Sequence, residues 1–267
     1  GTGEMMSRIE AEISNPLGDL AWGGSTELYA AAAEGAFASV ELPNDAAVIA
    51  QDPNHKWHAT DVLFQAMAVN TDRVTEADYP ATLTDFQDPK WKGLGKIAFA
   101  NPRSSGTTYS VLASMVTAHG WEFLDTFLPN AAVVDGSSAM FDGIRTGEYA
   151  AGWINEDLGN AWMQEGAPLK LIYPTDGVSN QIGAAAIIEG AKNAEPAKVF
   201  VDFLMSPEAQ TAIVELVGRR SARNDVPAPE GLVPAADLNL VEPDPAVFAK
   251  DKEGVLTKWD EKLAAFN

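Results

Sequence analysis

Two spacings of apolar residues alternate along the chain, and they predict strands that are followed by helices. Short, mostly apolar runs are typical of buried strands, and they occur at residues 62–70, 96–100, 131–134, 150–154, 169–174 and 182–188. Apolar residues three or four positions apart are typical of helices, and they occur at residues 4–15, 27–33, 109–119, 121–128, 139–146, 157–165, 194–205, 207–217 and 252–265. This alternation predicts an α/β fold with mostly parallel sheets flanked by helices.

Two of the predicted strands are long enough to run from one lobe into another. Residues 62–70 and 182–188 bracket a central block that itself alternates strand and helix. We therefore predict a discontinuous lobe of residues 1–67 and 187–267 that encloses a continuous lobe of residues 68–186, with a cleft between them. The first predicted helix has no strand before it, so we expect an N-terminal strand to be missing from this sequence.

The composition of the chain excludes several classes of partner and of chemistry. The 267 residues are 46% hydrophobic, carry a formal net charge of −20 and contain no cysteine. The strong negative charge argues against nucleic acid as a partner. The absence of cysteine excludes disulfides, thiolate metal sites and cysteine nucleophiles, and no window approaches the 18 apolar residues of a membrane span.

The segment from Asn101 to Tyr109, Asn-Pro-Arg-Ser-Ser-Gly-Thr-Thr-Tyr, lies between a predicted buried strand and a predicted helix. Ser104, Ser105 and Thr107 are candidate helix caps, and Gly106 allows a ligand to approach the backbone closely. A helix N-terminus with free N–H groups binds anions readily. The same residues are also compatible with an ordinary capped helix that binds nothing.

Similar small polar turns precede other predicted helices, and ligands of open α/β sheets bind at the carboxyl ends of strands. If the turns converge, they form one anion site. The candidate residues in these turns are Thr2, Gly24, Ser25, Thr26, Ser104, Ser105, Gly106, Thr107, Ser137 and Ser138.

Three further groups could complete a pocket, and each has a structural alternative. Glu156 and Asp157 offer acceptors for an amine or a hydroxyl, or they cap the next helix. Trp153, like Trp22 and Trp162, could wall the pocket or lie in the core. Arg220 could bind an anionic ligand, but it and its neighbours Arg219 and Arg223 could also form ion pairs.

No catalytic signature is present. The chain lacks Gly-x-Ser-x-Gly, His-Glu-x-x-His and Gly-x-x-x-x-Gly-Lys-Ser/Thr motifs. His55 and His58 lie in a hydrophilic loop and His119 at a predicted helix end, so we assign all three structural roles. We therefore expect no catalysis, no metal site and no cofactor.

Four segments together resemble a known family. They are "RIEAEISNPLGDLAWGGS", "LTDFQDPKWKGLGKIAFANPRSSGTTY", "GEYAAGWINEDLGNAWMQEGAPLKLIYPTDG" and "GAKNAEPAKVFVDFLMSPEAQ". They are similar to solute-binding proteins of bacterial ABC importers, in the branch of ferric-ion, phosphonate and sugar-phosphate binders. The resemblance implies a two-lobed periplasmic-binding-protein fold of the second type, with a hinge of crossing strands and no catalysis. It also implies a periplasmic location, a small anionic solute as ligand, an inner-membrane ABC permease as partner and a monomeric state.

The resemblance also suggests ligand-binding roles. Ferric binders of this branch carry a Tyr-Tyr pair after the strand that here ends at Ile154, and this chain has none. By the same resemblance Ser105, Gly106 and Thr107 would hold a phosphonate or phosphate, and Glu156 or Asp157 would bind the far end of the ligand. We therefore expect 2-aminoethylphosphonate as ligand. A sugar phosphate, ferric iron and, in a different class, an enzyme acting on a phosphorylated substrate remain alternatives.

Overall fold

The computed structural model describes residues 2–24 and 35–266, and its contacts divide the chain into two compact units. Unit 1 consists of Gly1–Leu63 and Gln181–Glu230, and unit 2 consists of Phe64–Asn180 and Gly231–Asn267. Each unit has hydrophobic clusters of its own. The predicted helix at 27–33 lies outside the described residues.

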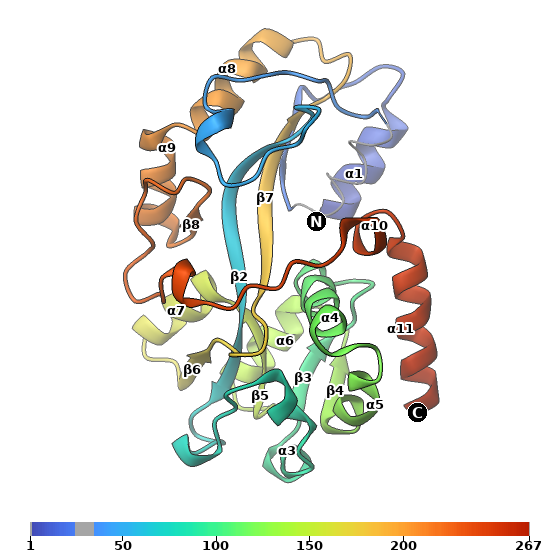
Figure 1. The fold of residues 1–267 in the computed structure, drawn as a ribbon, viewed down its shortest axis with the longest axis vertical. Helices are drawn as coiled ribbons and strands as arrows, with labels where there is room; N and C mark the ends of the chain where they lie inside the picture. The colour runs from blue at the N-terminus through green and yellow to red at the C-terminus, as the bar shows by residue number, and fades with distance from the viewer. Residues whose placement is uncertain (1, 25–34, 267) are drawn as a thin grey trace. The chain divides into compact units, whose positions relative to one another are not determined.

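Unit 1 is built on antiparallel strand pairs (Figure 1). Leu20 to Gly23 of β1 pair with Ile187 to Ala184 of β7, and Asp61 and Val62 of β2 pair with Ser221 and Arg220 of β8. The elements with residues in this unit are α1 (Thr2–Ala11), β1 (Leu20–Gly23), η1 (Asp45–Ala47), β2 (His58–Asn70), β7 (Ser179–Ile187), α8 (Ala194–Leu204), α9 (Pro207–Ala212), η5 (Ile213–Val217) and β8 (Arg220–Ser221).

Unit 2 contains the parallel strands. β3 pairs in parallel with β4 and β5, while β2 pairs antiparallel with β5 and β6. Besides parts of β2 and β7, its elements are η2 (Glu76–Asp78), η3 (Leu83–Gln87), α3 (Lys90–Leu94), β3 (Ile97–Ala100), α4 (Gly106–His119), α5 (Phe123–Phe127), η4 (Leu128–Asn130), β4 (Ala131–Val134), α6 (Ser137–Arg145), β5 (Ala151–Asn155), α7 (Glu156–Gln164), β6 (Leu169–Ile172), η6 (Ala235–Asp237), α10 (Pro245–Phe248) and α11 (Lys252–Phe266).

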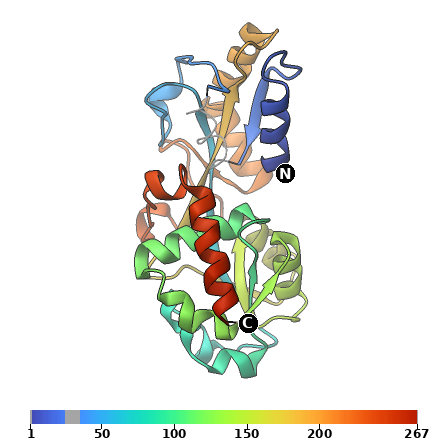
Figure 2. The ribbon, with the colours of Figure 1, turned by 90° about the vertical axis from the view of Figure 1, so that its right-hand side faces the viewer.

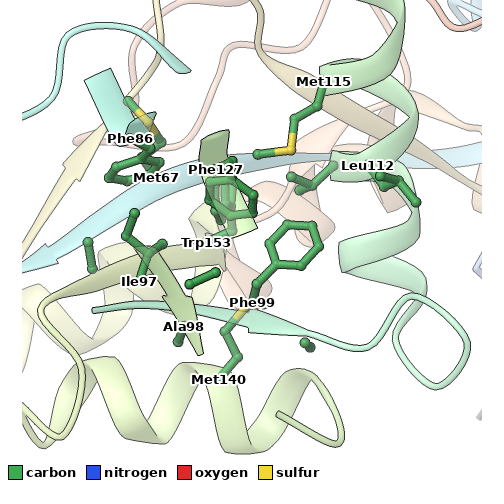
Figure 3. Packing of buried hydrophobic residues seen from close by; sticks show 14 of the residues in the cluster. Met67, Phe86, Ile97, Ala98, Phe99, Leu112, Met115, Phe127, Met140 and Trp153 are labelled. Atoms are coloured by element: carbon green, nitrogen blue, oxygen red, sulfur yellow. The ribbon is translucent and has the colours of Figure 1, made fainter. Parts of the chain in front are cut away.

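The core of unit 2 surrounds strand β3. Leu112 and Met115 of α4 lie on one side of this strand and Met140 of α6 lies on the other, with Phe99 directed toward α4 (Figure 3). Burying side chains of this size stabilises the fold by about 1.5–3 kcal/mol each. The two helices are therefore fixed on opposite faces of the parallel strands, and so are the turns that lead into them.

The α/β class predicted from the sequence is confirmed, but the sheet is mixed rather than mostly parallel. Strands β3, β4 and β5 are parallel because a helix follows each of them and returns the chain to the same end. The two long predicted strands exist as β2 and β7, and each has residues in both units. Both form antiparallel pairs, which apolar runs alone do not reveal.

The C-terminal tail is placed differently from the prediction. We assigned residues 187–267 to the discontinuous lobe, whereas residues 231–267 belong to unit 2. The reason is α11, the red helix that lies beside green helices of unit 2 (Figure 2). Its Val255, Leu256 and Trp259 are buried in the core of unit 2. Because the tail returns to unit 2, neither unit is continuous in the sequence.

Candidate functional site

Three helix N-termini follow three neighbouring parallel strands in unit 2. Strand β3 leads into α4, β4 into α6 and β5 into α7. The carboxyl ends of parallel strands lie at the same edge of a sheet. The first N–H groups of a helix have no partner within it, and its dipole is positive at that end. This edge of unit 2 therefore concentrates three sets of N–H donors.

Hydroxyl groups connect the first two of these N-termini. The Ser105 Oγ caps α4 by accepting from the Thr108 N–H at 3.0 Å, and it lies 2.6 Å from the Ser137 Oγ at the start of α6. Ser104 donates to the carbonyl oxygens of Asn101 and Asp135, which joins the turn after β3 to the turn after β4. The structure thus brings Ser104, Ser105 and Ser137 together, as the sequence predicted for converging turns.

A second contact connects α4 to α7. The Thr107 Oγ1 donates to the Asn155 Oδ1 at 3.2 Å. Because that oxygen accepts, the Asn155 Nδ2 is turned the other way, and it forms no hydrogen bond with any residue that the structure describes. Asn155 precedes α7 at the carboxyl end of β5. It is an anion-donor candidate that we did not select from the sequence, although its position just after a strand is the same signal that selected Ser105.

The remaining predicted residues of these turns differ in position. Gly106 and Ser138 are exposed in the first turns of α4 and α6. Thr2 begins α1, and Gly24 lies beside a cavity of unit 1. Ser25 and Thr26 lie outside the described residues.

Glu156 does not present its carboxylate to the outside. The side chain is 1% exposed, and its Oε2 accepts a hydrogen bond from the Tyr173 hydroxyl at 2.6 Å. Asp157 is half-buried, and its Oδ1 accepts from the Leu158 N–H at 2.8 Å. Direct contact between Glu156 and a ligand is therefore not supported, because burial and Tyr173 already satisfy this carboxylate.

Trp153 is a core residue, which corrects its assignment to a pocket wall. It is 2% exposed and makes edge contacts with Phe86, Phe99 and Phe127, with ring centroids 5.1–5.8 Å apart. The apolar strand that carries it is buried on both faces, so a wide aromatic ring at this position packs inward.

Arg220 is also placed differently from the prediction. It is 4% exposed and pairs through β8 with Val62 of β2. Its neighbour Arg219 lines a cavity of unit 1 and lies 3.2 Å from the Asp61 Oδ2. Arg219 lies just before β8, and of the two arginines it is the one that lines this cavity.

That cavity measures about 370 Å³ and is formed by unit 1 alone. Asp61, Arg219 and Gln181 are its polar lining residues, and Trp22, Leu63, Ile213 and Val217 are its large apolar ones. Among the described residues, Gly23, Gly24 and Gly183 also line it.

The histidines have structural partners. The Nδ1 atoms of His58 and His55 lie 2.6 and 3.3 Å from the two carboxylate oxygens of Asp45, and the His119 Nε2 lies 2.9 Å from Asp176. Burial alone would raise the pKa of Asp45, but hydrogen bonds from His58 and the Leu42 N–H outweigh it and hold this pKa below its ordinary value. Among the described residues, no group of three or more His, Asp or Glu side chains is arranged to hold a metal ion.

Comparison with known proteins extends this picture. Residues 28–252 match the family described as bacterial extracellular solute-binding protein. A solved structure of the periplasmic binding protein AfuA from Actinobacillus pleuropneumoniae, with exogenous fructose-6-phosphate bound, superposes with a TM-score of 0.86 at 25% identity, covering 98% of this chain and 88% of that one.

Two curated relatives match over less of this chain. An uncharacterized protein of Haemophilus influenzae is 29% identical over 79% of this chain, and the match spans 64% of that relative's length. A putative 2-aminoethylphosphonate-binding periplasmic protein of Salmonella paratyphi A is 23% identical over 85% of this chain and 68% of its own length. No helix among the described residues has both the length and the apolar composition needed to cross a bilayer.

Proposed function

Because the chain belongs to the family of bacterial extracellular solute-binding proteins, which are binding proteins rather than enzymes, we propose that it captures a small phosphonate or phosphate ester for import. The first candidate is 2-aminoethylphosphonate, the ligand in the name of the Salmonella relative. The observation that carries the proposal is the set of three helix N-termini in unit 2, connected by Ser105–Ser137 and Thr107–Asn155 contacts.

The chemistry of this edge suits a tetrahedral anion. Backbone N–H groups of several helices can donate to several oxygens at once, and three helix dipoles favour negative charge without any lysine or arginine. In a chain of net charge −20, such donors attract an anion locally while the rest of the surface repels it. The Asn155 amide adds a donor beside Thr107.

A sugar phosphate is the second candidate, and one observation favours it. The amine of an aminoalkylphosphonate needs a carboxylate, but the Glu156 carboxylate is buried and bonded to Tyr173. Asp157 remains as the partner of an amine in unit 2. The structure bound to fructose-6-phosphate shows that a protein of this fold accommodates a sugar phosphate.

Ferric iron is the weakest candidate. The chain has no Tyr-Tyr pair, and the described residues contain no cluster of metal-binding side chains. As for other partners, we propose delivery of the solute to an ABC permease, a periplasmic location and a monomeric protein.

A thermal-shift assay tests the proposal. We expect 2-aminoethylphosphonate or glucose 6-phosphate, at about 100 times its dissociation constant, to add about 2.7 kcal/mol of stability. Ferric citrate serves as the control for the iron alternative. Stabilisation by ferric citrate alone, with a coloured complex, would overturn the proposal, and turnover of a phosphorylated substrate would show that the protein is an enzyme.

A further inference from the structure

The turn that carries Ser104 and Ser105 also contains Arg103, and the guanidinium of this arginine contacts helix α11. The Arg103 Nε donates to the Asp260 Oδ2 at 2.9 Å, and its Nη2 donates to the Glu253 Oε1 at 3.0 Å. The Nη2 also lies 2.7 Å from the Asp260 Oδ2, and the Nη1 donates to the Glu253 Oε2 at 3.4 Å. One side chain therefore joins the turn after β3 to two carboxylates of the C-terminal helix.

The spacing of the two carboxylates places them on one face of α11. Glu253 and Asp260 are seven positions apart, which is about two helical turns. Leu256 lies between them at helical spacing from both and is buried in the core of unit 2. The helix cannot rotate its carboxylates away from Arg103 without exposing Leu256, so the core also fixes the position of this acidic pair.

A second contact joins the C-terminal tail to the other end of the same turn. Tyr109, in the first turn of α4, is 2% exposed, and its hydroxyl donates to the Phe248 carbonyl oxygen of α10 at 2.7 Å. The Lys252 Nζ lies 5.2 Å from the centroid of the Tyr109 ring. The tail thus contacts the chain on both sides of Ser104 and Ser105.

The backbone of Arg103 belongs to the hydrogen-bonded turn that places these serines. The Arg103 N–H donates to the Asn101 Oδ1, and the N–H groups of Ser104 and Ser105 both donate to the Asn101 carbonyl oxygen, each at 3.0 Å. The Ser105 Oγ lies 2.6 Å from the Ser137 Oγ. A shift of Arg103 therefore moves hydroxyls that connect two helix N-termini, and donors to an anion lose strength when they are displaced by a fraction of an ångström.

Arg103 does not serve as a free cation for the anion. Its Nε, Nη1 and Nη2 all donate to carboxylates, and the two negative charges of Glu253 and Asp260 outweigh its single positive charge. An isolated exposed ion pair contributes little, but a planar guanidinium held by two carboxylates keeps a defined position. This arrangement fits an anchor for the turn better than a ligand-binding group.

We propose that Arg103 is a positioning residue of the anion site in unit 2, and that it holds the turn of Ser104 and Ser105 in place through Glu253 and Asp260 of α11. The inference rests on the function proposed above, and it gives the C-terminal helix a part in ligand affinity.

Calorimetric titration of 2-aminoethylphosphonate and glucose 6-phosphate into the double variant Glu253→Gln/Asp260→Asn tests this role. The variant retains the charge of Arg103 and makes the chain less negative, so electrostatics alone would strengthen anion binding. A loss of positioning has the opposite sign, and we expect about fivefold weaker binding than in the wild type. Arg103→Gln, which loses the same contacts, should weaken binding by about five- to tenfold.

Lys262→Gln is the matched control. The Lys262 Nζ lies 2.7 Å from the Asp125 Oδ1, so this ion pair also joins α11 to unit 2, but through α5 instead of the turn. We expect its ligand affinity to equal that of the wild type. Amide hydrogen exchange of the free protein, followed by NMR, gives a second measurement. Exchange at Ser104 and Ser105 should be at least about fivefold faster in the double variant and unchanged in Lys262→Gln.

Three results would overturn the inference. They are equal or tighter ligand binding in the double variant, unchanged exchange at Ser104 and Ser105, or an equal loss of affinity in Lys262→Gln, which would indicate a general loosening of α11. If the wild type bound neither compound, the proposed function would fail. The exchange measurement needs no ligand, so it would still decide whether Glu253 and Asp260 hold the turn.

The altered side chains are partly exposed, so circular dichroism should show all these variants folded.

Discussion

The two units present polar groups in different ways. In unit 2, parallel strands β3, β4 and β5 deliver helix N-termini to one edge, and the donors are mainly backbone N–H groups and hydroxyls. In unit 1, antiparallel pairs leave a cavity whose polar groups are the side chains of Asp61, Gln181 and Arg219. Helix N-termini after parallel strands favour an anion, whereas the described lining of the unit 1 cavity carries one residue of each charge sign.

The largest expected effect is a loss of stability at a glycine where two parts of the backbone pack closely. A Cβ on Gly152 would lie 2.7 Å from the Ala98 carbonyl oxygen, a backbone atom of β3, and 2.7 Å from the Ile144 Cδ1. We expect Gly152→Ala to lower the free energy of unfolding by about 3 kcal/mol, measured by chemical denaturation.

Gly183→Ala and Gly93→Ala complete this comparison. At Gly183 the clash is with the Asp61 side chain, which can shift at the cost of its contacts, so we expect a smaller loss of about 1–2 kcal/mol. Gly93 lies in α3 with nothing within 4 Å of an added Cβ, and Gly93→Ala should leave stability unchanged or raise it by up to about 1 kcal/mol. A greater loss of stability for Gly183→Ala than for Gly152→Ala would contradict the expectation that a clash with backbone costs more than a clash with a movable side chain.

Asn155→Asp tests the donor edge of unit 2. The change keeps the shape of the side chain but replaces its Nδ2 donor by a carboxylate oxygen, which repels an anion. We expect the affinity for 2-aminoethylphosphonate or glucose 6-phosphate to fall about 100-fold, or about 2.7 kcal/mol, by isothermal titration calorimetry. Equal phosphate-ester affinity in both proteins would remove Asn155 from the site.

Asp45→Asn tests the dependence of unit 1 on a buried charge. The pKa of Asp45 lies below its ordinary value of about 3.9, so its stabilising contribution is complete above that pH and is lost as the pH falls through the folded-state pKa. We expect the variant to lose about 1–2 kcal/mol of stability at pH 7, and this difference from the wild type should shrink as the pH falls through the lowered pKa of Asp45.

The exposed carboxylate of Asp72 provides the matched control. Asp72→Asn should change stability little at either pH, since the Asp72 side chain lies on the surface. If Asp45→Asn lost the same stability at every pH, the charge of Asp45 would not contribute to the stability of the fold.

Thr107→Val has the smallest expected effect on binding. It removes one hydroxyl from the donor edge and releases the Asn155 amide, while Thr107→Ser retains the hydroxyl. We expect a loss of about five- to tenfold in phosphate-ester affinity for valine and little change for serine. Similar losses in both variants would indicate a packing effect instead.

The sequence predicted the convergence of turns in unit 2 better than the composition of the cavity of unit 1. Ser105, Thr107 and Ser137 could be selected because a buried strand, a small polar turn and a helix follow one another locally. The cavity of unit 1 joins Trp22, Asp61, Gln181 and Arg219, which are far apart in the chain. Their juxtaposition depends on antiparallel pairing and register, and no local pattern encodes either.

The errors of prediction have the same origin. The position of Trp153 in a buried strand was recognised, but which face of that strand packs on Phe86 depends on its neighbours. Arg219 and Arg220 could not be ranked without the pairing of β8 with β2, because this pairing includes Arg220 and begins just after Arg219. The Glu156 carboxylate accepts a hydrogen bond from Tyr173, which lies seventeen residues later in the chain, and no local pattern predicts this contact.

The central claim is that the three helix N-termini of unit 2 bind a tetrahedral anion. It is tested most directly by calorimetric titration of 2-aminoethylphosphonate and glucose 6-phosphate into the wild-type chain and into Asn155→Asp. We predict micromolar or tighter binding of at least one compound to the wild type, about −8 kcal/mol or more favourable, and about 100-fold weaker binding to the variant. Binding of neither compound, or binding that Asn155→Asp leaves unchanged, would contradict the claim.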